Sequence, residues 1–372
     1  MLRSIISQFW RGFAYLIFLG IWIEIALQGF YYATAGDFLF RRVALPIYAS
    51  EPYASFQNRP GLLFDHRTNE FHAHYYINQA GFRVPHPGLE YSKAKPPNTY
   101  RIMILGPSFA FGWGVEYELS FAAVLQQLLQ ERSFAGGKQI EIINAAIPSM
   151  PIVSQLAWFE HVGKDYEPDF VIQFVYGSMA IGSVPENLHV DEQGYLVGNS
   201  TASGRWLERL KKVATVFYSW EVWTSISRWW APPVAVLGAG RQIAPAADFD
   251  PAHSEVRESM YVYNKLAGIV HATGARLLIV YFPLSYVIHR EDESRWRHLG
   301  ISDVSRQMAF DAAFVRYLND GHIPTINITE QLHKSASTGK RMYFWLDIHW
   351  TAAGNASAAR AVADYLTDRI KE

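Results

Sequence analysis

Three side chains that together carry out acyl transfer stand at two distant points of this 372-residue sequence. Ser108 follows an apolar run, and Asp347 and His349 are separated by a single residue near the carboxyl end. In acyl transfer an imidazole takes the proton of the attacking serine, and a carboxylate fixes the orientation of that imidazole. The sequence therefore holds the residue types of a serine-dependent acyl-transfer site.

The segment around Ser108 predicts where its hydroxyl lies. Four apolar residues, Ile102–Leu105, indicate a short buried strand, which a glycine and a proline end before a glycine-punctuated loop. Ser108 is thereby placed at the carboxyl end of a strand, where open α/β sheets bind their ligands. Asp347 and His349 stand on a loop before the last predicted helix, and we expect them to line the same edge of the sheet.

Strands and helices alternate from Arg101 onward. The predicted strands are Ile102–Leu105, Ile140–Asn144, Phe170–Tyr176, Arg276–Tyr281 and Ile323–Ile328. The predicted helices are Ser120–Glu131, Ile152–His161, about Ser254–Thr273, Asp303–Asn319 and Thr351–Ile370. This alternation is typical of a parallel sheet with helices on both faces. We expect one doubly wound α/β domain of about five strands over residues 101–372, preceded by a linker with few regular runs over 35–100.

An apolar segment precedes the linker. After a short tail of residues 1–11, residues 12–34 are nearly all apolar and are long enough to cross a bilayer as a helix. Aromatic residues at both ends fit anchoring at the two membrane interfaces. A cleaved signal peptide is the competing interpretation, because Ala33–Ala35 resembles a cleavage site, but the apolar run of a signal peptide is shorter. We expect an uncleaved, single-pass anchor.

The charges around this span bear on its orientation. Arg3, Arg11 and the terminal amine precede it and Arg41 and Arg42 follow it, so the positive-inside bias is slight. The simpler assumption places the amino terminus in the cytoplasm and the body of the chain in the periplasm, on an inner membrane. Glu24 lies inside the span, where an ionisable group is costly unless it faces water or a partner. Two interpretations stay open: a carboxyl that lipid tolerates, or a helix that packs against other membrane helices.

Residues 182–251 form an insertion that does not follow the alternation. Its middle, from Trp206 to Leu237, is rich in apolar residues and tryptophans at helical spacing. Such a stripe covers the core of the parent domain, or else forms a lid, a membrane surface or a subunit contact. The candidate contacts to lipid or to a partner are Glu24, Trp220, Trp223, Trp229 and Trp230.

Composition excludes several classes of function. The formal net charge is −1 at pH 7 and no basic stripe stands out, so we expect no nucleic-acid partner. The sequence has no cysteine, which excludes disulfides and thiolate metal sites. His72 and His74 could share one face of an extended segment, but no third ligand is near them in the sequence. We expect neither a metal nor a cofactor.

Two sequence blocks are specific enough to indicate a family. The first combines Ile77–Arg83 with Arg101–Ser108, and the second is Asp347–Thr351. On these blocks the chain resembles the SGNH/GDSL hydrolases, in particular their membrane-anchored bacterial branch, which includes polysaccharide O-acetylation proteins. The resemblance covers roughly Tyr76 to Ile370 and implies a flavodoxin-like α/β fold.

By position, the resemblance makes Ser108 the nucleophile, His349 the general base and Asp347 its orienting acid. The family's first block normally reads Gly-Asp-Ser, whereas Pro107 stands here at the middle position. Proline has neither a backbone N–H nor a carboxylate, so it cannot support the loop in the same way.

The family's oxyanion donors are also altered. A glycine and an asparagine supply these donors in the family, together with the N–H of the serine. Alignment places Ala146 or Ser149 at the glycine and Gly177–Ala180 where Asn-Asp is expected, so Ser149 and Ser178 are the candidate replacements. Loss of one donor typically lowers turnover by roughly 100- to 1,000-fold.

Two functions follow from these observations. The favoured one is a catalytically degraded accessory or structural subunit of a multi-subunit membrane complex, with lipid and other membrane proteins as partners. The alternative is a serine esterase or O-acyltransferase that acts on acetyl esters of a cell-envelope polysaccharide or lipid. The altered oxyanion donors favour the first, and the complete set of Ser, His and Asp favours the second.

Overall fold

The computed structural model describes most of the chain. The described residues are 2–35, 38–39, 46–68, 70–177, 189–190, 192, 194, 196–197, 210, 212–219, 222, 249–252, 254–293, 304–345 and 347–369. The chain forms two compact units: the first joins residues 1–45 with 199–234, and the second joins 46–198 with 235–372. The second unit is the α/β domain, and it takes in most of the segment predicted as a linker.

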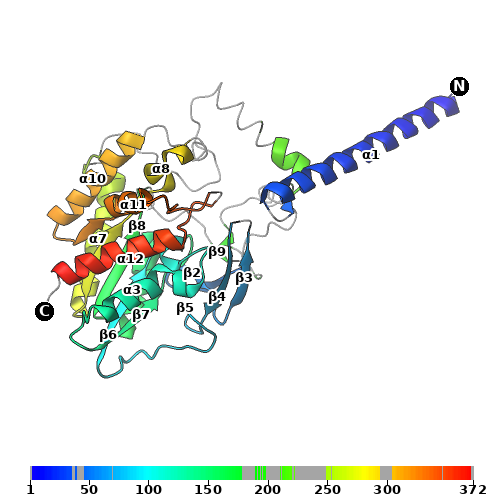
Figure 1. Ribbon diagram of the computed structural model, residues 1–372. Helices are drawn as coiled ribbons and strands as arrows, with labels where there is room; N and C mark the ends of the chain where they lie inside the picture. Colours follow the sequence, from blue (N-terminus) through cyan, green and yellow to red (C-terminus); the bar gives the residue numbers. More distant parts are fainter. Residues whose placement is uncertain are drawn as a thin grey trace. The chain divides into compact units, whose positions relative to one another are not determined.

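One sheet forms the centre of the α/β domain, with the strand order β12-β11-β8-β6-β7-β5-β4-β3 (Figure 1). Its parallel strands are β6 (Thr99–Leu105), β7 (Gln139–Asn144), β8 (Phe170–Val175), β11 (Arg276–Tyr281) and β12 (Thr325–Asn327). Adjacent members of this set pair in parallel throughout. The predicted α/β fold with a mostly parallel sheet is confirmed.

The helices cover the sheet in two layers. They are α3 (Phe121–Glu131), α4 (Ile152–His161), α7 (Ser254–Ala272), α10 (Val304–Asp320), α11 (Thr329–Ala336) and α12 (Ala352–Arg369). The chain passes from β6 to β7 and then returns beyond β6 to β8, so right-handed crossovers place α3 and α4 on opposite faces. In agreement, α12 packs against α3 and α7 packs against α4 (Figure 1).

The strand order reverses between β6 and β8. Ligands of doubly wound folds bind at this switch point, outside the carboxyl ends of the strands. Ser108 follows β6 directly and therefore stands at the switch point.

The expected linker over 35–100 is partly regular, and the expectation of few regular runs was wrong. β1 (Tyr48–Glu51) and β2 (Ser55–Asn58) form an antiparallel pair. β3 (Leu63–Arg67), β4 (His72–Ile77) and β5 (Arg83–Val84) continue the main sheet beyond β7 in antiparallel pairings. Burial alternates along β4 with the period of two that a half-buried strand requires.

Large apolar side chains fill the space between the sheet and the layer of α3 and α12. Trp350 is 1% exposed and packs on the rings of Phe109, Phe174 and Phe282. α12 also holds the start of α3, because Oδ1 of Asn355 accepts a hydrogen bond from the backbone N–H of Phe121 at 3.0 Å. The core thus lies directly beneath the loop that follows β6.

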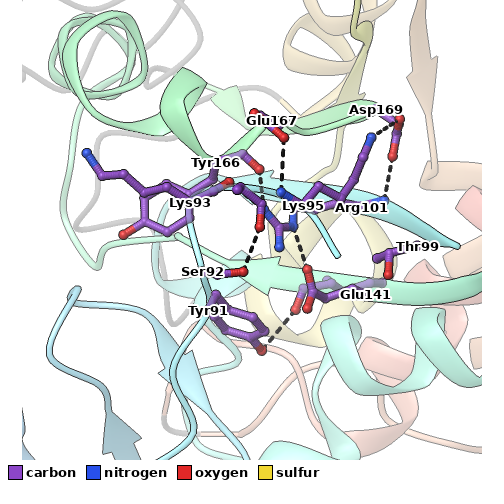
Figure 2. Close-up of polar contacts among 12 residues, drawn as sticks. Tyr91, Ser92, Lys93, Lys95, Thr99, Arg101, Glu141, Tyr166, Glu167 and Asp169 are labelled. Carbon is purple, nitrogen blue, oxygen red and sulfur yellow. Dashed lines mark hydrogen bonds and ion pairs between the residues drawn. The ribbon is translucent and has the colours of Figure 1, made fainter. Parts of the chain in front are cut away.

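A buried arginine fixes the amino end of β6. The Arg101 side chain is fully buried, and its Nε and Nη1 atoms donate to Glu141 and to the backbone oxygen of Tyr166, both at 2.5 Å (Figure 2). Its backbone N–H donates to Asp169 at 2.7 Å. These contacts tie β6 to β7 and to the start of β8, at the end of the sheet away from Ser108.

The first unit contains α1, a long helix over Leu2–Ala35. Within it, Gln8–Ala33 is long and apolar enough to cross a membrane. The described part of the insertion includes a helical turn over residues 214–219 in this unit, and the short antiparallel pair β9 (His189–Val190) and β10 (Leu196–Val197) in the α/β domain. Trp220, Trp223, Trp229 and Trp230 lie outside the described residues.

Candidate active site

The structure brings Ser108, His349 and Asp347 into one line of contacts. The Nε2 atom of His349 lies 2.5 Å from Oγ of Ser108, and its Nδ1 atom contacts Oδ1 of Asp347. A carboxylate at Nδ1 holds the ring proton there, so Nε2 of the neutral imidazole faces the serine hydroxyl as an acceptor. His349 is buried while Ser108 keeps partial exposure, as a nucleophile that must meet a substrate requires.

The carboxyl of Asp347 is held in its ionised form. Burial on its own would raise its pKa, but the charge interaction with His349 and the hydrogen bonds from the His349 ring and backbone lower this pKa overall. The backbone bond, from the His349 N–H to Oδ1, measures 2.9 Å. An ionised Asp347 can both orient the imidazole and stabilise the imidazolium that forms when Ser108 loses its proton.

The turn before Ser108 needs its glycine and accepts its proline. A Cβ on Gly106 would stand 2.7 Å from Cβ of Ala110 and 2.8 Å from Cβ of Phe174. Pro107 caps the short helix α2 (Ser108–Phe111) with a φ of −78°, close to the angle that the proline ring imposes. The backbone at this position therefore accommodates the proline ring.

Two buried side chains hold the loop after Ser108. Arg83 donates from Nη1 to the backbone oxygens of Phe111 (2.7 Å) and Gly112 (2.5 Å), and from Nη2 to that of Val115 (2.6 Å). Nδ2 of Asn144, at the end of β7, also donates to the Phe111 oxygen, at 3.3 Å. These contacts support the loop after Ser108 without a carboxylate at position 107.

Backbone contacts join the two ends of the loop that carries Asp347 and His349. Tyr343 and Trp350 form an antiparallel bridge, and the N–H of Thr351 donates to the oxygen of Met342 at 3.0 Å. The first turn of α12 presses on this base, because a Cβ on Gly354 would lie 2.1 Å from the Met342 oxygen. Only glycine fits there, and this close packing fixes where the loop leaves the core.

Glu70, between β3 and β4, fixes the other side of the same loop. Its two carboxylate oxygens accept hydrogen bonds from the backbone N–H groups of Trp345, at 2.5 Å, and Asp347, at 2.8 Å. Hydrogen bonds to a charged acceptor contribute about 1.5–3 kcal/mol each. Sequence reasoning missed Glu70, since the residues it holds are 275 and 277 positions away and no local pattern indicates the contact.

We expect Glu70→Gln to lower kcat by about 10- to 100-fold with little change in KM. The glutamine amide keeps one acceptor but turns an NH2 group toward a backbone N–H, so the loop that carries Asp347 loses its fixed position. Initial rates on a p-nitrophenyl ester measure the effect, and Glu330→Gln, at an exposed site on α11, is the matched control. Equal kcat values for the two variants would contradict the positioning role.

His66 and Trp113 form a wall beside the site that sequence reasoning also missed. The Trp113 ring lies 5.5 Å from the His349 ring and 4.8 Å from the His66 ring, measured between centroids. The Tyr75 hydroxyl accepts from the N–H of Gly114 at 2.8 Å and lies 3.0 Å from Nδ1 of His66. The Tyr75 hydroxyl thus links the loop after Ser108 to the His66 ring.

Burial lowers the pKa of His66 to about 4. The charge of Asp347 raises this pKa, but by less than burial lowers it. The folded state therefore resists protonation that the unfolded chain accepts near pH 6.5. Stability should be full above about pH 6.5 and fall by roughly 3 kcal/mol as the pH drops to about 4. Urea unfolding at several pH values measures this, and His66→Phe should flatten the profile over that window. An unchanged slope in the variant would assign the loss to other groups.

The oxyanion site has two backbone candidates. The N–H of Ser108 is in the first turn of α2, where a helix offers no acceptor of its own. Of the two positions aligned with the family's glycine, Ala146 already donates its N–H to Asn144 Oδ1 at 3.2 Å. Ser149 is exposed and has a φ of +62°, the conformation that favours a glycine, and it is the better match to the family's glycine. Ser178 lies outside the described residues.

A chain of buried polar side chains holds the backbone at Gly177. The N–H of Gly177 donates to the Tyr281 hydroxyl at 3.0 Å, and that hydroxyl donates to Asp311. Nε2 of Gln307 donates to the same Asp311 oxygen at 2.6 Å. Burial raises the pKa of Asp311 to about 6, which these hydrogen bonds only partly offset. The chain fixes the backbone just before Ser178.

His72 and His74 lie on the exposed face of the β3–β4 hairpin and take part in ion pairs. Nε2 of His72 lies 2.6 Å from Asp65, and Nδ1 of His74 lies 2.8 Å from Glu116. The structure therefore supplies the third group, Asp65, that the sequence did not place nearby. The guanidinium of Arg67, with Nη2 3.4 Å from Nδ1 of His72, opposes a cation at this cluster.

The Ser108, His349 and Asp347 line at the switch point of a doubly wound sheet has the arrangement of a serine-dependent acyl-transfer site. Residues 245–372 match the family model described as SGNH hydrolase-like domain, acetyltransferase AlgX. The predicted resemblance to the SGNH superfamily and its O-acetylation branch is thereby confirmed. The matched range includes Asp347 and His349, whereas Ser108 precedes it. No curated protein sequence matches the chain.

Solved structures with similar chain courses include several esterases. LAE5, an α/β hydrolase from the metagenome of Lake Arreo, Spain, is 12% identical, with a TM-score of 0.42 and coverage of 73% of this chain and 97% of that one. The acetyl xylan esterase AlAXEase is 14% identical, with a TM-score of 0.41 and coverage of 73% and 100%. A lipolytic G-D-S-L family protein from Veillonella parvula DSM 2008 is 13% identical, with a TM-score of 0.36 and coverage of 71% and 97%.

Proposed function

We propose that the chain is a membrane-anchored serine O-acyltransferase or esterase that acts on acetyl esters of a cell-envelope polysaccharide or lipid. The observation that carries this proposal is the unbroken line of contacts from Asp347 through His349 to the partly exposed Ser108. Drift after loss of activity would not be expected to preserve such a line across 241 residues of sequence. The family match to an acetyltransferase domain supports acetyl as the acyl group.

The geometry supports a two-step reaction. Nε2 of His349 takes the proton of Ser108 while Oγ attacks the acyl carbonyl, and the backbone N–H groups of Ser108 and Ser149 are the candidate donors to the resulting oxyanion. The imidazolium then gives its proton to the leaving oxygen, which departs and leaves an acyl-serine. Water or an acceptor hydroxyl attacks this ester with His349 again as base, giving hydrolysis or acyl transfer.

Covalent trapping tests the proposal directly. We expect the detergent-solubilised full chain to react with a fluorophosphonate probe at Ser108, as identified by mass spectrometry, and to release p-nitrophenol from p-nitrophenyl acetate. Ser108→Ala should abolish both signals, while Ser337→Ala, at an exposed serine, should leave them unchanged. Addition of a polysaccharide acceptor separates the two activities, because a transferase moves the acetyl group to the acceptor and an esterase releases acetate.

The second candidate is a catalytically silent accessory subunit of a membrane complex. The observation that favours it is the missing asparagine in the segment Gly177–Ala180. A folded protein that neither reacts with the probe nor turns over the ester would favour this candidate over the first.

We further propose that α1 anchors the chain in an inner membrane with the α/β domain in the periplasm. The length and apolar composition of Gln8–Ala33 support the anchor, and the slight charge bias supports the orientation. Alkaline extraction of membranes tests the anchor, and protease protection in spheroplasts tests the side on which the domain lies. Release of the full chain by alkali would contradict the anchor.

A further inference from the structure

Glu24, inside the apolar helix α1, finds its hydrogen-bond partners within its own unit. Its carboxylate oxygens accept from the backbone N–H groups of Ala214 (2.6 Å) and Thr215 (3.0 Å) and from the Thr215 hydroxyl (3.0 Å). Nε2 of Gln28, one turn along α1, donates to Glu24 at 2.8 Å and to the backbone oxygen of Lys212 at 3.1 Å. Glu24 therefore caps a helical turn of the insertion and needs no second membrane protein to compensate its charge.

The insertion covers one face of the last part of α1. From Gln8 to Ile23 every residue of the helix is exposed, whereas Glu24, Leu27, Gln28 and Tyr31 are shielded. Their spacing of three, one and three residues defines a single helical face. Rings extend the contact, since Phe217 meets Tyr31 at 5.8 Å and Tyr218 meets Phe30 at 5.9 Å between centroids. The covered face thus begins at Glu24 and runs toward the carboxyl end of the helix.

We propose that the hydrocarbon boundary at the carboxyl end of α1 lies at Glu24, and that residues 212–219 rest in the lipid headgroup layer against the last turns of α1. The proposal rests on the membrane anchor proposed above. Lys212 and Val213 are exposed beside the Glu24 carboxylate, and the turn at 214–219 is too short to span a bilayer. An open segment of this kind does not occur in hydrocarbon, because lipid cannot satisfy its backbone groups.

The aromatic rings at this level support the same placement. Phe30 and Tyr31 lie within the two turns of α1 that follow Glu24, and their rings contact Tyr218 and Phe217 of the insertion. Tyrosine, as at positions 31 and 218, is enriched at the membrane–water interface, where its ring meets acyl chains and its hydroxyl meets water. The lipid headgroup layer is therefore the environment that the turn and the end of α1 share.

The length of α1 allows this boundary. A core of about 30 Å needs roughly twenty residues at about 1.5 Å each, so a span that ends at Glu24 begins near Ile5. Arg11 then lies about 9 Å inside, and its long side chain can extend back toward the headgroups. A span over residues 12–34 would leave Arg11 outside the hydrocarbon. It would place Glu24 and the backbone of the insertion near the centre of the bilayer, where neither can reach the headgroups.

Depth measurements by spin labelling test the boundary. The chain has no cysteine, so single-cysteine variants of the full chain carry one label each. Labels at Leu19, Ala26, Ser219 and Lys340 are compared in phosphatidylethanolamine and phosphatidylglycerol vesicles for collision with oxygen and with a water-soluble nickel chelate. We expect the Leu19 label in hydrocarbon, those at Ala26 and Ser219 at headgroup depth, and that at Lys340 in water.

Each alternative outcome overturns a distinct statement. An Ala26 label as deep as the one at Leu19 places the boundary beyond Glu24, and a Ser219 label as accessible to the chelate as the one at Lys340 removes the insertion from the lipid surface. A Leu19 label in water refutes the anchor as well. In a second variant, Glu24→Leu should raise chelate access at Ser219 several-fold, while Ile25→Leu, on the exposed face of α1, should not; equal access in the two would overturn the capping role.

Discussion

Replacement of Asp347 by asparagine is expected to lower kcat on p-nitrophenyl acetate by about 10,000-fold, with KM changed by no more than a few-fold. The reason is the tautomer of His349. Asp347 accepts the Nδ1 proton and the backbone N–H of His349, and its lowered pKa keeps it charged at neutral pH. An asparagine can turn its NH2 group to Nδ1, which moves the ring proton to Nε2 and leaves no base facing Ser108.

A matched control separates this effect from a general loss of charge. Asp320→Asn removes a carboxylate at an exposed site at the end of α10 and should leave kcat unchanged. Retention of more than a tenth of the activity in Asp347→Asn would show that His349 is oriented by another group. The fluorophosphonate reaction rate should fall in parallel with kcat, since it depends on the same activated serine.

Replacement of Arg83 by methionine is expected to destabilise the α/β domain by about 1–3 kcal/mol. The guanidinium is fully buried and satisfies three backbone oxygens of the loop after Ser108. Methionine fills the volume but donates no hydrogen bond, so the Val115 oxygen loses the guanidinium while the oxygens of Phe111 and Gly112 keep only the weaker bonds from Asn144 and the Val115 N–H. An unsatisfied buried group costs about 1–3 kcal/mol. The aromatic rings of Tyr75 and Phe111, 4.8 and 4.9 Å from the guanidinium carbon, lose a cation as well.

Denaturant unfolding followed by tryptophan fluorescence measures this loss. Arg360→Met, at an exposed position of α12, serves as the control and should change stability by less than about 0.5 kcal/mol. Arg83→Lys should fall between the two, since one ammonium cannot reach three separate oxygens in the geometry of the planar guanidinium. Equal denaturant midpoints for Arg83→Met and Arg360→Met would contradict the stabilising role of Arg83.

The parts of the molecule with local signals could be predicted from the sequence. Runs such as Ile102–Leu105 are short, apolar and bounded by glycine or proline, so the parallel strands followed from pattern alone. β3 and β4 did not, because β4 alternates His72, His74 and Tyr76 with buried residues and reads as polar without its register. The sequence therefore predicts a linker over 35–100, where the structure has these strands.

The same distinction holds within the site. Ser108, Asp347 and His349 could be named because acyl transfer needs those residue types, and their mutual contacts were then found in the structure. The roles of Glu70 and Arg83 depend on contacts with backbone groups of distant loops. No pattern in the sequence indicates such contacts. Pro107 illustrates the converse, since a residue that departs from the family pattern fits its backbone angle without strain.

The contact between Glu70 and the loop at Trp345 also determines at which stage of folding the site can form. Chain segments 275 residues apart must meet before Asp347 is held, and closures of such high sequence separation come late in folding. During synthesis Ser108 emerges long before His349, so a nascent or truncated chain carries the serine with no imidazole to activate it. The acyl chemistry proposed above therefore requires that the segment with Asp347 and His349 has been made and has packed against the sheet.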